Sequence, residues 1–143
     1  MKTMQLQQID RVTTITKEDF LKKYFKPQKP VIIERFVEDW PAFTKWNLDY
    51  IAEVAGDKMV PLYDNRPVSH QDGFNEPHAK MKMRDYVELL KTEPTKYRIF
   101  LWNILKEIPQ LQNDFYYPDF GLKLMKGLPM LFFGGKDSYT FMH

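Results

Sequence analysis

Apolar residues in the first half of the chain recur at spacings that predict a helix, a strand and a second helix. A helix is expected from Thr16, which can cap it, through an apolar stripe that ends at Phe25 before two prolines. The β-branched run Val31–Ile33 then predicts a short buried strand. A second helix is expected from Asn47, a good capping residue, to a stop at Gly56.

Prolines and short apolar runs divide the rest of the chain into further short elements. Residues 39–41 predict a turn, because the residue before a proline is driven out of the helical region. A third helix is expected from about Met83 to just before Pro94, and residues 103–127 mix short helical turns with prolines. Strands are predicted at residues 59–63, 98–102, 131–133 and 138–143.

This irregular mixture of helices and strands predicts an α+β fold. No internal repeat or flexible linker interrupts the pattern, so one domain over residues 1–143 is expected. The pattern ends inside a predicted strand, and folded proteins rarely leave such an edge unpaired. We therefore expect more chain to follow His143 in the intact gene product.

Composition fits a soluble globular protein with a substantial core, since 43% of residues are hydrophobic and 15% aromatic. The 21 basic and 19 acidic residues are interleaved, so the net charge of +2 gives no support to nucleic-acid binding. There are no cysteines, which removes thiolate chemistry and fits a reducing compartment. The polar N-terminus and the absence of a long apolar run predict a cytoplasmic protein without a membrane partner.

Three histidines are the first candidates for site residues. His70 and His78 lie in a polar stretch with Asp64, Asp72 and Glu76, which together could in principle hold zinc or iron. Their spacing matches no standard metal motif, so we interpret the stretch as an exposed polar loop. At most, this loop borders a substrate groove. The tryptophans at 40, 46 and 102 and the methionines at 125, 130 and 142 are interpreted as core residues.

His143 stands in a more informative context. Residues 128–143 form a strand, a Gly-Gly turn and a second strand in which Thr140 precedes His143 by three residues. Together with the Pro-led strand 29–36 and the Trp-Pro turn at 39–43, this segment resembles the JmjC and cupin-like oxygenases, most closely the asparaginyl-hydroxylase-like cupins. The matches run in order from about residue 16 to residue 143.

The resemblance implies the first strands of a double-stranded β-helix, cut off before the barrel closes. It also implies that His143 is the first ligand of Fe(II) and that Thr140 donates a hydrogen bond to the far carboxylate of 2-oxoglutarate. The Asp and the second His of the facial triad would follow His143 and are not within these residues, so the catalytic set is incomplete. This chain alone is therefore expected to be inactive and to bind neither group.

One departure from the family pattern falls at Phe100, where some relatives carry a Tyr that contacts 2-oxoglutarate. A Phe there is equally well explained as an ordinary core residue. The function implied by the resemblance is a hydroxylase of protein side chains or a related substrate. The alternative is a non-catalytic module of cupin ancestry that forms a homodimer through exposed strand edges.

Overall fold

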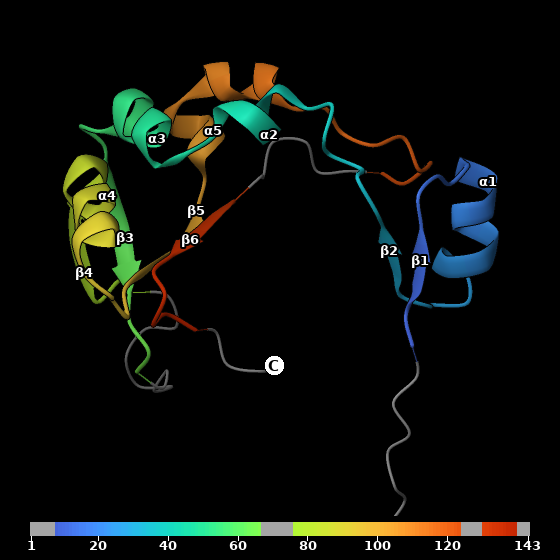
Figure 1. Cartoon of the computed structure of the whole chain (residues 1–143), viewed down its shortest axis with the longest axis horizontal. Helices are drawn as coiled ribbons and strands as arrows, with labels where there is room; N and C mark the ends of the chain where they lie inside the picture. The colour runs from blue at the N-terminus through green and yellow to red at the C-terminus, as the bar shows by residue number, and fades with distance from the viewer. Residues whose placement is uncertain (1–7, 67–75, 124–129, 140–143) are drawn as a thin grey trace, which may run out of the picture.

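The structure is a computed structural model and describes residues 8–66, 76–123 and 130–139. Figure 1 shows its two ends: a small N-terminal unit around β1 and β2, and a larger sheet with helices α3 and α4, which has four strands. The predicted α+β class is confirmed, and the sheet does not close into a barrel within the described ranges. The expectation of one domain over residues 1–143 stays a prediction.

The N-terminal unit joins two short parallel strands across a helical turn. Strand β1 (Asp10–Val12) pairs with β2 (Val31–Ile33) in parallel. Between them, α1 (Lys17–Asp19) continues into the π-helical segment η1 (Phe20–Phe25). The hydroxyl of Thr16 accepts a hydrogen bond from the amide of Asp19 at 3.1 Å, which confirms the predicted cap.

The prediction that residues 31–33 form a buried strand is only half right. The strand exists, but Ile32 is exposed, because a two-stranded ribbon has no second layer to cover both faces. The partner strand β1 was not predicted, since three mostly polar residues carry no apolar alternation.

Two short helices connect this unit to the sheet. Trp40 is extended, as predicted for a residue before proline, but Pro41 starts helix α2 (Pro41–Lys45) where only a turn was expected. Helix α3 (Leu48–Ala55) begins after Asn47, whose side-chain oxygen accepts from the amide of Tyr50 at 2.9 Å. The prediction of this helix and its cap is confirmed.

The larger sheet is antiparallel throughout, with strand order β4-β3-β5-β6. Its strands are β3 (Met59–Tyr63), β4 (Ala79–Lys82), β5 (Arg98–Trp102) and β6 (Leu131–Gly134). The remaining helical segments are α4 (Met83–Thr92), α5 (Ile104–Glu107) and the 3-10 turn η2 (Pro109–Asp114). Strand β4 was missed by the sequence patterns, whereas β3, β5, β6 and α4 were predicted.

A β-bulge interrupts the pairing of β5 with β6. Ile99 lies opposite Phe133 and Trp102 opposite Leu131, so three steps along β5 match two along β6. Leu101, inside the bulge, has a φ of 54° and is exposed. The bulge turns Trp102 into the core although strict alternation from Ile99 would place it on the other face.

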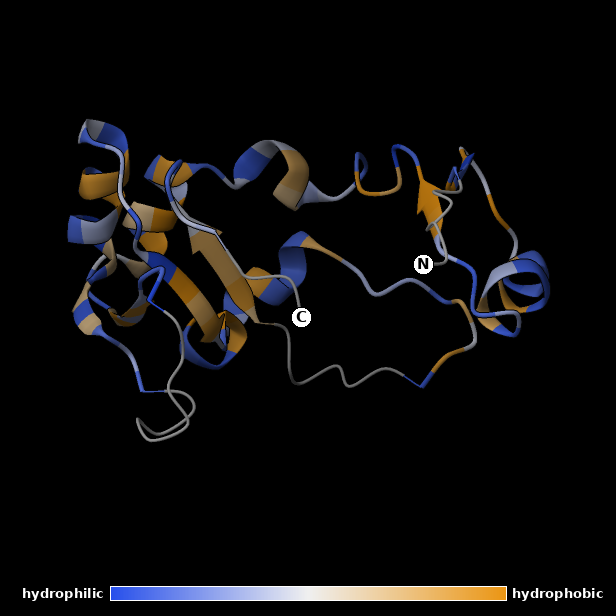
Figure 2. Ribbon diagram, turned by 90° about the horizontal axis from the view of Figure 1, so that it is seen from below, coloured by the Kyte–Doolittle hydropathy of each residue, from blue (hydrophilic) through white to orange (hydrophobic). Residues whose placement is uncertain are grey.

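The main core lies between the sheet and the helices. The apolar strands are visible in Figure 2, and their inward residues pack against the helices above them. The least exposed members come from β3, β5, α4 and η2: Val60, Leu62, Ile99, Met83, Tyr86, Val87 and Leu111. Trp102 belongs to this core, whereas Trp40, Trp46 and Met130 are only partly buried, and Met125 and Met142 lie outside the described residues.

A buried carboxylate joins three of the helical segments. Asp114, at the end of η2, accepts from the Nζ of Lys45 and the Nε1 of Trp46, both at 2.8 Å, and from the hydroxyl of Tyr50 at 3.4 Å. Burial works to raise the pKa of Asp114, but these hydrogen bonds outweigh it and hold the pKa below its usual value. The ionised carboxylate therefore fixes α2 and α3 against η2.

The segment after β6 differs from the prediction of a strand. Ser138 and Tyr139 are not in a strand, and the rest of the predicted strand 138–143 lies outside the described residues. Over the parts of the chain that are described, no helix is both long enough and apolar enough to span a membrane.

Candidate functional site

A polar cluster lies where strand β3 ends. Asp64, which is 4% exposed, follows the strand directly. Its carboxylate accepts from the backbone amide of Arg66 at 2.9 Å and from the Nε of Arg66 at 2.8 Å. Its own amide donates to the Nδ1 of His78 at 2.9 Å. The cluster therefore folds the chain after β3 back over the start of β4.

Asp64 is held in its ionised form by these contacts. Burial works to raise the pKa of its carboxyl, but the hydrogen bonds from Arg66 and the nearby His78 outweigh burial and lower the pKa. The Nδ1 of His78 also lies 3.0 Å from the Oδ1 of Asp64. One ring nitrogen cannot accept from the amide and donate to the carboxylate at the same time, so only one of these two contacts is a hydrogen bond at any moment.

Asn65 connects the cluster to the segment that follows β6. Its Nδ2 donates to the carbonyl of Asp137 at 2.8 Å, and its Oδ1 accepts from the amide of Tyr139 at 3.2 Å. The same Oδ1 accepts from the Nη1 of Arg98 at 3.2 Å. The side chain of Asn65 thus joins the end of β3, the start of β5 and the segment that follows β6. That segment immediately precedes Thr140 in the sequence.

Arg98, the first residue of β5, is a second cation of this cluster, besides Arg66. Its Nη1 also donates to the carbonyl of Asp64 at 2.9 Å. Tyr63 and Gly134 lie opposite Arg98 on the two neighbouring strands, so these three positions form one row across the sheet. A side chain at Gly134 would crowd this row, because an added Cβ would lie 3.1 Å from the Cβ of Arg98.

An aromatic ladder continues the same face of the sheet. The ring of Phe100 makes edge contacts with those of Tyr63 and Phe132, with centroids 5.8 Å and 5.1 Å apart. Tyr63 makes a further edge contact with His78. Phe100 therefore lies on the face opposite the main core and close to Arg98, so the interpretation of Phe100 as a residue of the main core is wrong.

The site residues expected from the resemblance are not visible in the described part of the chain. Thr140 and His143 lie outside the described residues, as do His70 and Asp72. Sequence reasoning did not single out Arg98 or Asn65. At Arg98, the sequence shows a charged residue at the start of an otherwise apolar strand, and this could have marked it as a candidate. Asn65 carries no such signal, because only the fold brings it close to Arg98.

The described residues provide no iron site by themselves. Within residues 8–66, 76–123 and 130–139, no group of three or more His, Cys, Asp or Glu side chains could hold a metal ion. A carboxylate ligand is a different matter, because the guanidinium of Arg98 has the donor geometry that a carboxylate accepts.

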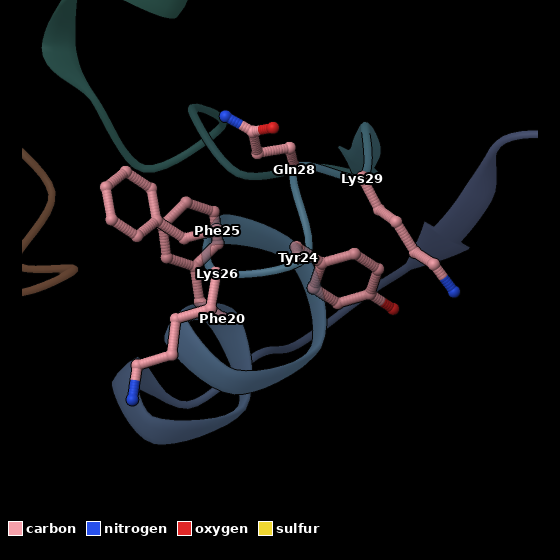
Figure 3. Close-up of a pocket in the computed structure, with 6 residues that line it drawn as sticks. All are labelled: Phe20, Tyr24, Phe25, Lys26, Gln28 and Lys29. Carbon is pink, nitrogen blue, oxygen red and sulfur yellow. The ribbon is translucent and has the colours of Figure 1, made fainter.

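Two hollows elsewhere lack the polar groups of this cluster. An open pocket of about 500 Å³ beside η1 is lined by Phe20, Tyr24, Phe25, Lys26, Gln28 and Lys29. In Figure 3 the side chains of Lys26 and Lys29 extend to opposite sides, so their charges do not converge. A second hollow of about 310 Å³ between α2, α5 and residues 115–118 is lined almost entirely by apolar groups.

The unclosed sheet, with an aromatic ladder on the face opposite the core and the polar cluster before Thr140, fits part of a cupin fold. The chain matches the Cupin-like domain family over residues 17–143 and belongs to that family. Among curated proteins it is 27% identical over 121 residues to the lysine-specific demethylase JMJ30 of Arabidopsis thaliana, covering 83% of this chain and 28% of that protein. The predicted JmjC and cupin-like relationship is confirmed.

Of two further relatives, one has the same named activity as JMJ30 and the other has a different one. Lysine-specific demethylase 8 of Xenopus tropicalis is 29% identical over 112 residues, which cover 72% of this chain and 23% of that protein. The human tRNA wybutosine-synthesizing protein 5 is 23% identical over 134 residues, which cover 78% of this chain and 41% of that protein. The chain thus spans about a quarter of the length of the first two relatives.

Proposed function

We propose that the chain is the N-terminal part of an Fe(II)- and 2-oxoglutarate-dependent oxygenase that hydroxylates a protein side chain or a related substrate. The observation that carries this proposal is the family match from residue 17 to residue 143, which reaches Thr140 and His143. In the proposal, His143 is the first iron ligand and Thr140 donates to the far carboxylate of 2-oxoglutarate. The cytoplasmic location expected from the sequence is part of the same proposal.

The described structure supports the proposal through the face on which the site would form. Strands β5 and β6 present an aromatic, partly open surface, and Asn65 ties the segment Asp137–Tyr139 to the end of β3. Bound iron would activate dioxygen, which is the oxidant, and 2-oxoglutarate would donate two electrons and leave as succinate and carbon dioxide. The residues of this chain would position the cosubstrate, exclude water with aromatic rings and hold the strand ends in place.

The remaining ligands are proposed to come from residues beyond these 143. Ferrous iron in this class needs two His and one carboxylate, and a single imidazole holds it weakly against water. We propose that the gene continues after His143 with one residue and then an Asp, and later a second His. The nucleotide sequence after the codon for His143 tests this directly.

The decisive experiment compares the 143-residue chain with the complete gene product. Under anaerobic conditions, we expect ferrous iron and 2-oxoglutarate to bind the complete product and not the 143-residue chain. The complete product should convert 2-oxoglutarate to succinate, and His143→Ala should abolish that conversion. Tight binding of both groups by the 143-residue chain, or full turnover by the His143→Ala variant, would contradict the proposal.

The exposed edge of β6 favours one alternative function. This strand pairs only with β5 in the described structure, and Phe132 on it is 58% exposed. Such an edge can pair with a strand of another chain, so a self-associating, non-catalytic module is the second candidate. Light scattering after size exclusion separates the two: a monomer at high concentration would exclude self-association, and a dimer would support it.

A further inference from the structure

The turn that ends η1 carries a side chain at a position where glycine is usual. The amide of Lys29 donates to the carbonyl of Tyr24 at 2.8 Å, and the amide of Gln28 donates to the carbonyl of Phe25 at 3.1 Å. This pair of bonds is that of a Schellman motif, whose first residue after the helix end has a positive φ and is usually glycine. Here Gln28 occupies that position with a φ of 56°. The chain therefore keeps a side chain where glycine would be less strained.

Phe25, at the end of η1, is the outer end of a row of aromatic rings. Its ring contacts that of Phe20, with centroids 6.4 Å apart, and Phe20 stacks on Phe120 at 4.4 Å. Phe120 also stacks on Phe36. The inner rings are partly buried, whereas Phe25 is 53% exposed. The exposed ring is thus held in place before any partner binds, which lowers the entropic cost of using it as a contact.

Three exposed lysines lie on η1 or just after it without an anionic partner. Lys22, Lys26 and Lys29 form no ion pair within the ranges that the structure describes. Lys23, by contrast, pairs with Asp19. Cations near the carboxyl end of a helix complement its dipole, which accounts for Lys22 and Lys26 but not for Lys29, beyond the helix end. The three charges are therefore available to an anionic partner.

The exposed ring, the side chain of Gln28 and two of the lysines line the same open pocket beside η1, which has a volume of about 500 Å³. Figure 3 shows the ammonium groups of Lys26 and Lys29 on opposite sides. This separation suits an extended chain better than a single small anion, because an extended chain can place a carboxylate on each side and an apolar side chain between them. Lysine binds as a point charge on a flexible stem, so neither contact requires a narrow geometry.

We propose that this pocket docks an acidic peptide segment of a partner protein, with an apolar side chain on Phe25 and carboxylates paired with Lys26 and Lys29. The amide of Gln28 hydrogen-bonds the backbone of that segment. Three unpaired cations are too few for a nucleic-acid backbone or an anionic bilayer, which need a longer basic surface. The same surface of a second copy would bring like charges together. The site belongs to the N-terminal unit and does not depend on iron or 2-oxoglutarate.

Fluorescence anisotropy of a labelled peptide tests the site in the 143-residue chain. The peptide is blocked at both ends and carries one phenylalanine between three acidic residues on each side. We expect saturable binding that weakens as salt is added, and none by a peptide in which lysines replace the acidic residues. No saturable binding, or equal binding of the basic peptide, would overturn the inference. Displacement of the acidic peptide by oligothymidylate or phosphatidylserine vesicles at lower concentrations than by unlabelled peptide would also overturn it.

Charge reversal separates docking from non-specific attraction. The double variant Lys26→Glu and Lys29→Glu should weaken peptide binding by roughly tenfold or more, because two charged contacts are lost. Lys80→Glu with Lys106→Glu is the matched control, since it changes the net charge equally at exposed lysines of β4 and α5. This control should bind within about twofold of wild type. Equal weakening by the two double variants would overturn the inference.

Gln28→Gly distinguishes docking from a purely structural turn. Glycine suits the positive φ, so this variant should be at least as stable as wild type in urea denaturation. It removes the side chain from the pocket and should still weaken peptide binding about threefold, as expected for one lost hydrogen bond. Phe25→Ala removes the apolar contact and should weaken binding further. Unchanged affinity in these two variants would overturn the inference.

The same titration in the complete gene product asks whether the pocket is accessible in the intact protein. We expect the affinity of the 143-residue chain to be retained. Binding by the 143-residue chain but not by the complete product would show that other residues cover the pocket, and the inference would then be wrong.

Discussion

The two faces of the four-stranded sheet are built from alternate residues of the same strands, yet they differ in almost every property. On one face, Val60 and Leu62 of β3 are fully buried under α3 and α4. On the other, Met59 is 55% exposed, and Tyr63 stands in the aromatic row beside Arg98. We call these the covered face and the open face.

The difference shows how one strand can carry core residues on one face and residues of the candidate site on the other. Side chains alternate along a strand, so the covered face can be optimised for packing without constraining the open face. The covered face holds the core, whereas the open face holds Arg98 and the ladder of Tyr63, Phe100 and Phe132. Substitutions on the two faces should therefore have effects of different size and kind.

The largest effect is expected at the centre of the covered face. Leu62→Ala should lower the free energy of unfolding by about 2–5 kcal/mol, because it leaves a cavity under α4. Met59→Ala on the same strand is the control and should change it by about 0.5 kcal/mol or less, since Met59 faces outward. Urea denaturation measures both, and equal losses would show that the open face is packed as well.

The next largest effect on stability is expected at Asp64, the buried carboxylate that directly follows β3. Asp64→Asn should destabilise the fold by about 1.5–3 kcal/mol at pH 7, because the ionised carboxylate accepts hydrogen bonds from Arg66. Its folded pKa lies below the unfolded value of 3.8, so this stabilisation is present above that value and is lost as pH falls through the folded pKa.

Urea denaturation of wild type and Asp64→Asn between pH 3 and pH 7 checks both statements. The difference in unfolding free energy should shrink as the solution becomes acidic. Asp57→Asn, an exposed carboxylate paired with Arg84, should have an effect of about 1 kcal/mol or less. A difference for Asp64→Asn that grows toward acid would reverse the sign and contradict the assignment of an ionised buried carboxylate.

Tyr86 tests the hydrogen bonding of the covered face. Its buried hydroxyl lies 2.8 Å from the carbonyl of Tyr97 and 3.1 Å from that of Phe133, so it links α4 to β5 and β6. Tyr86→Phe should cost about 1 kcal/mol and leave the fold intact. Tyr116→Phe, at an exposed tyrosine, is the control and should have a smaller effect in the same denaturation experiment.

Alkaline titration gives a second readout for Tyr86. Burial raises the pKa of Tyr86 to about 12, above the usual value of 10.0. The stabilisation given by the protonated hydroxyl of Tyr86 is complete below the pKa of the unfolded state. It is lost as the pH rises through the pKa of the folded state. Wild type should therefore lose more stability than Tyr86→Phe between pH 10 and pH 12, and equal losses would contradict a buried hydroxyl.

The sequence predicts the covered face better than the open one, for physical reasons. Caps such as Thr16 and Asn47 and apolar runs such as β3 and β5 are local signals, and the structure confirms them. Strands β1 and β4 are three and four residues long and depend on partners distant in the sequence. Strands this short contain too few residues for an alternation of apolar and polar positions to be recognised.

The candidate site was predictable only in part because it is made by pairing. The resemblance pointed to Thr140 and His143 from local motifs, and those two assignments stay predictions. The contact between Arg98 and Asn65 joins residues that are 33 positions apart, and no spacing in the sequence predicts it. Strand register decides that Arg98 stands beside Tyr63 and Gly134, and register follows from tertiary pairing.

The smallest effect is expected on the open face, at Phe132. Phe132→Ala should lower the free energy of unfolding by about 1 kcal/mol or less, because it removes one ring contact with Phe100 and little buried area. Its neighbour Phe133 is partly buried against the core and Tyr86, so Phe133→Ala should cost about 2 kcal/mol. Urea denaturation at two protein concentrations measures the free energy of unfolding of both variants. A large loss for Phe132→Ala that depends on concentration would mean that a second copy covers the open face. A large loss without concentration dependence would mean that the chain covers this face itself, and the contrast between the two faces would then be wrong.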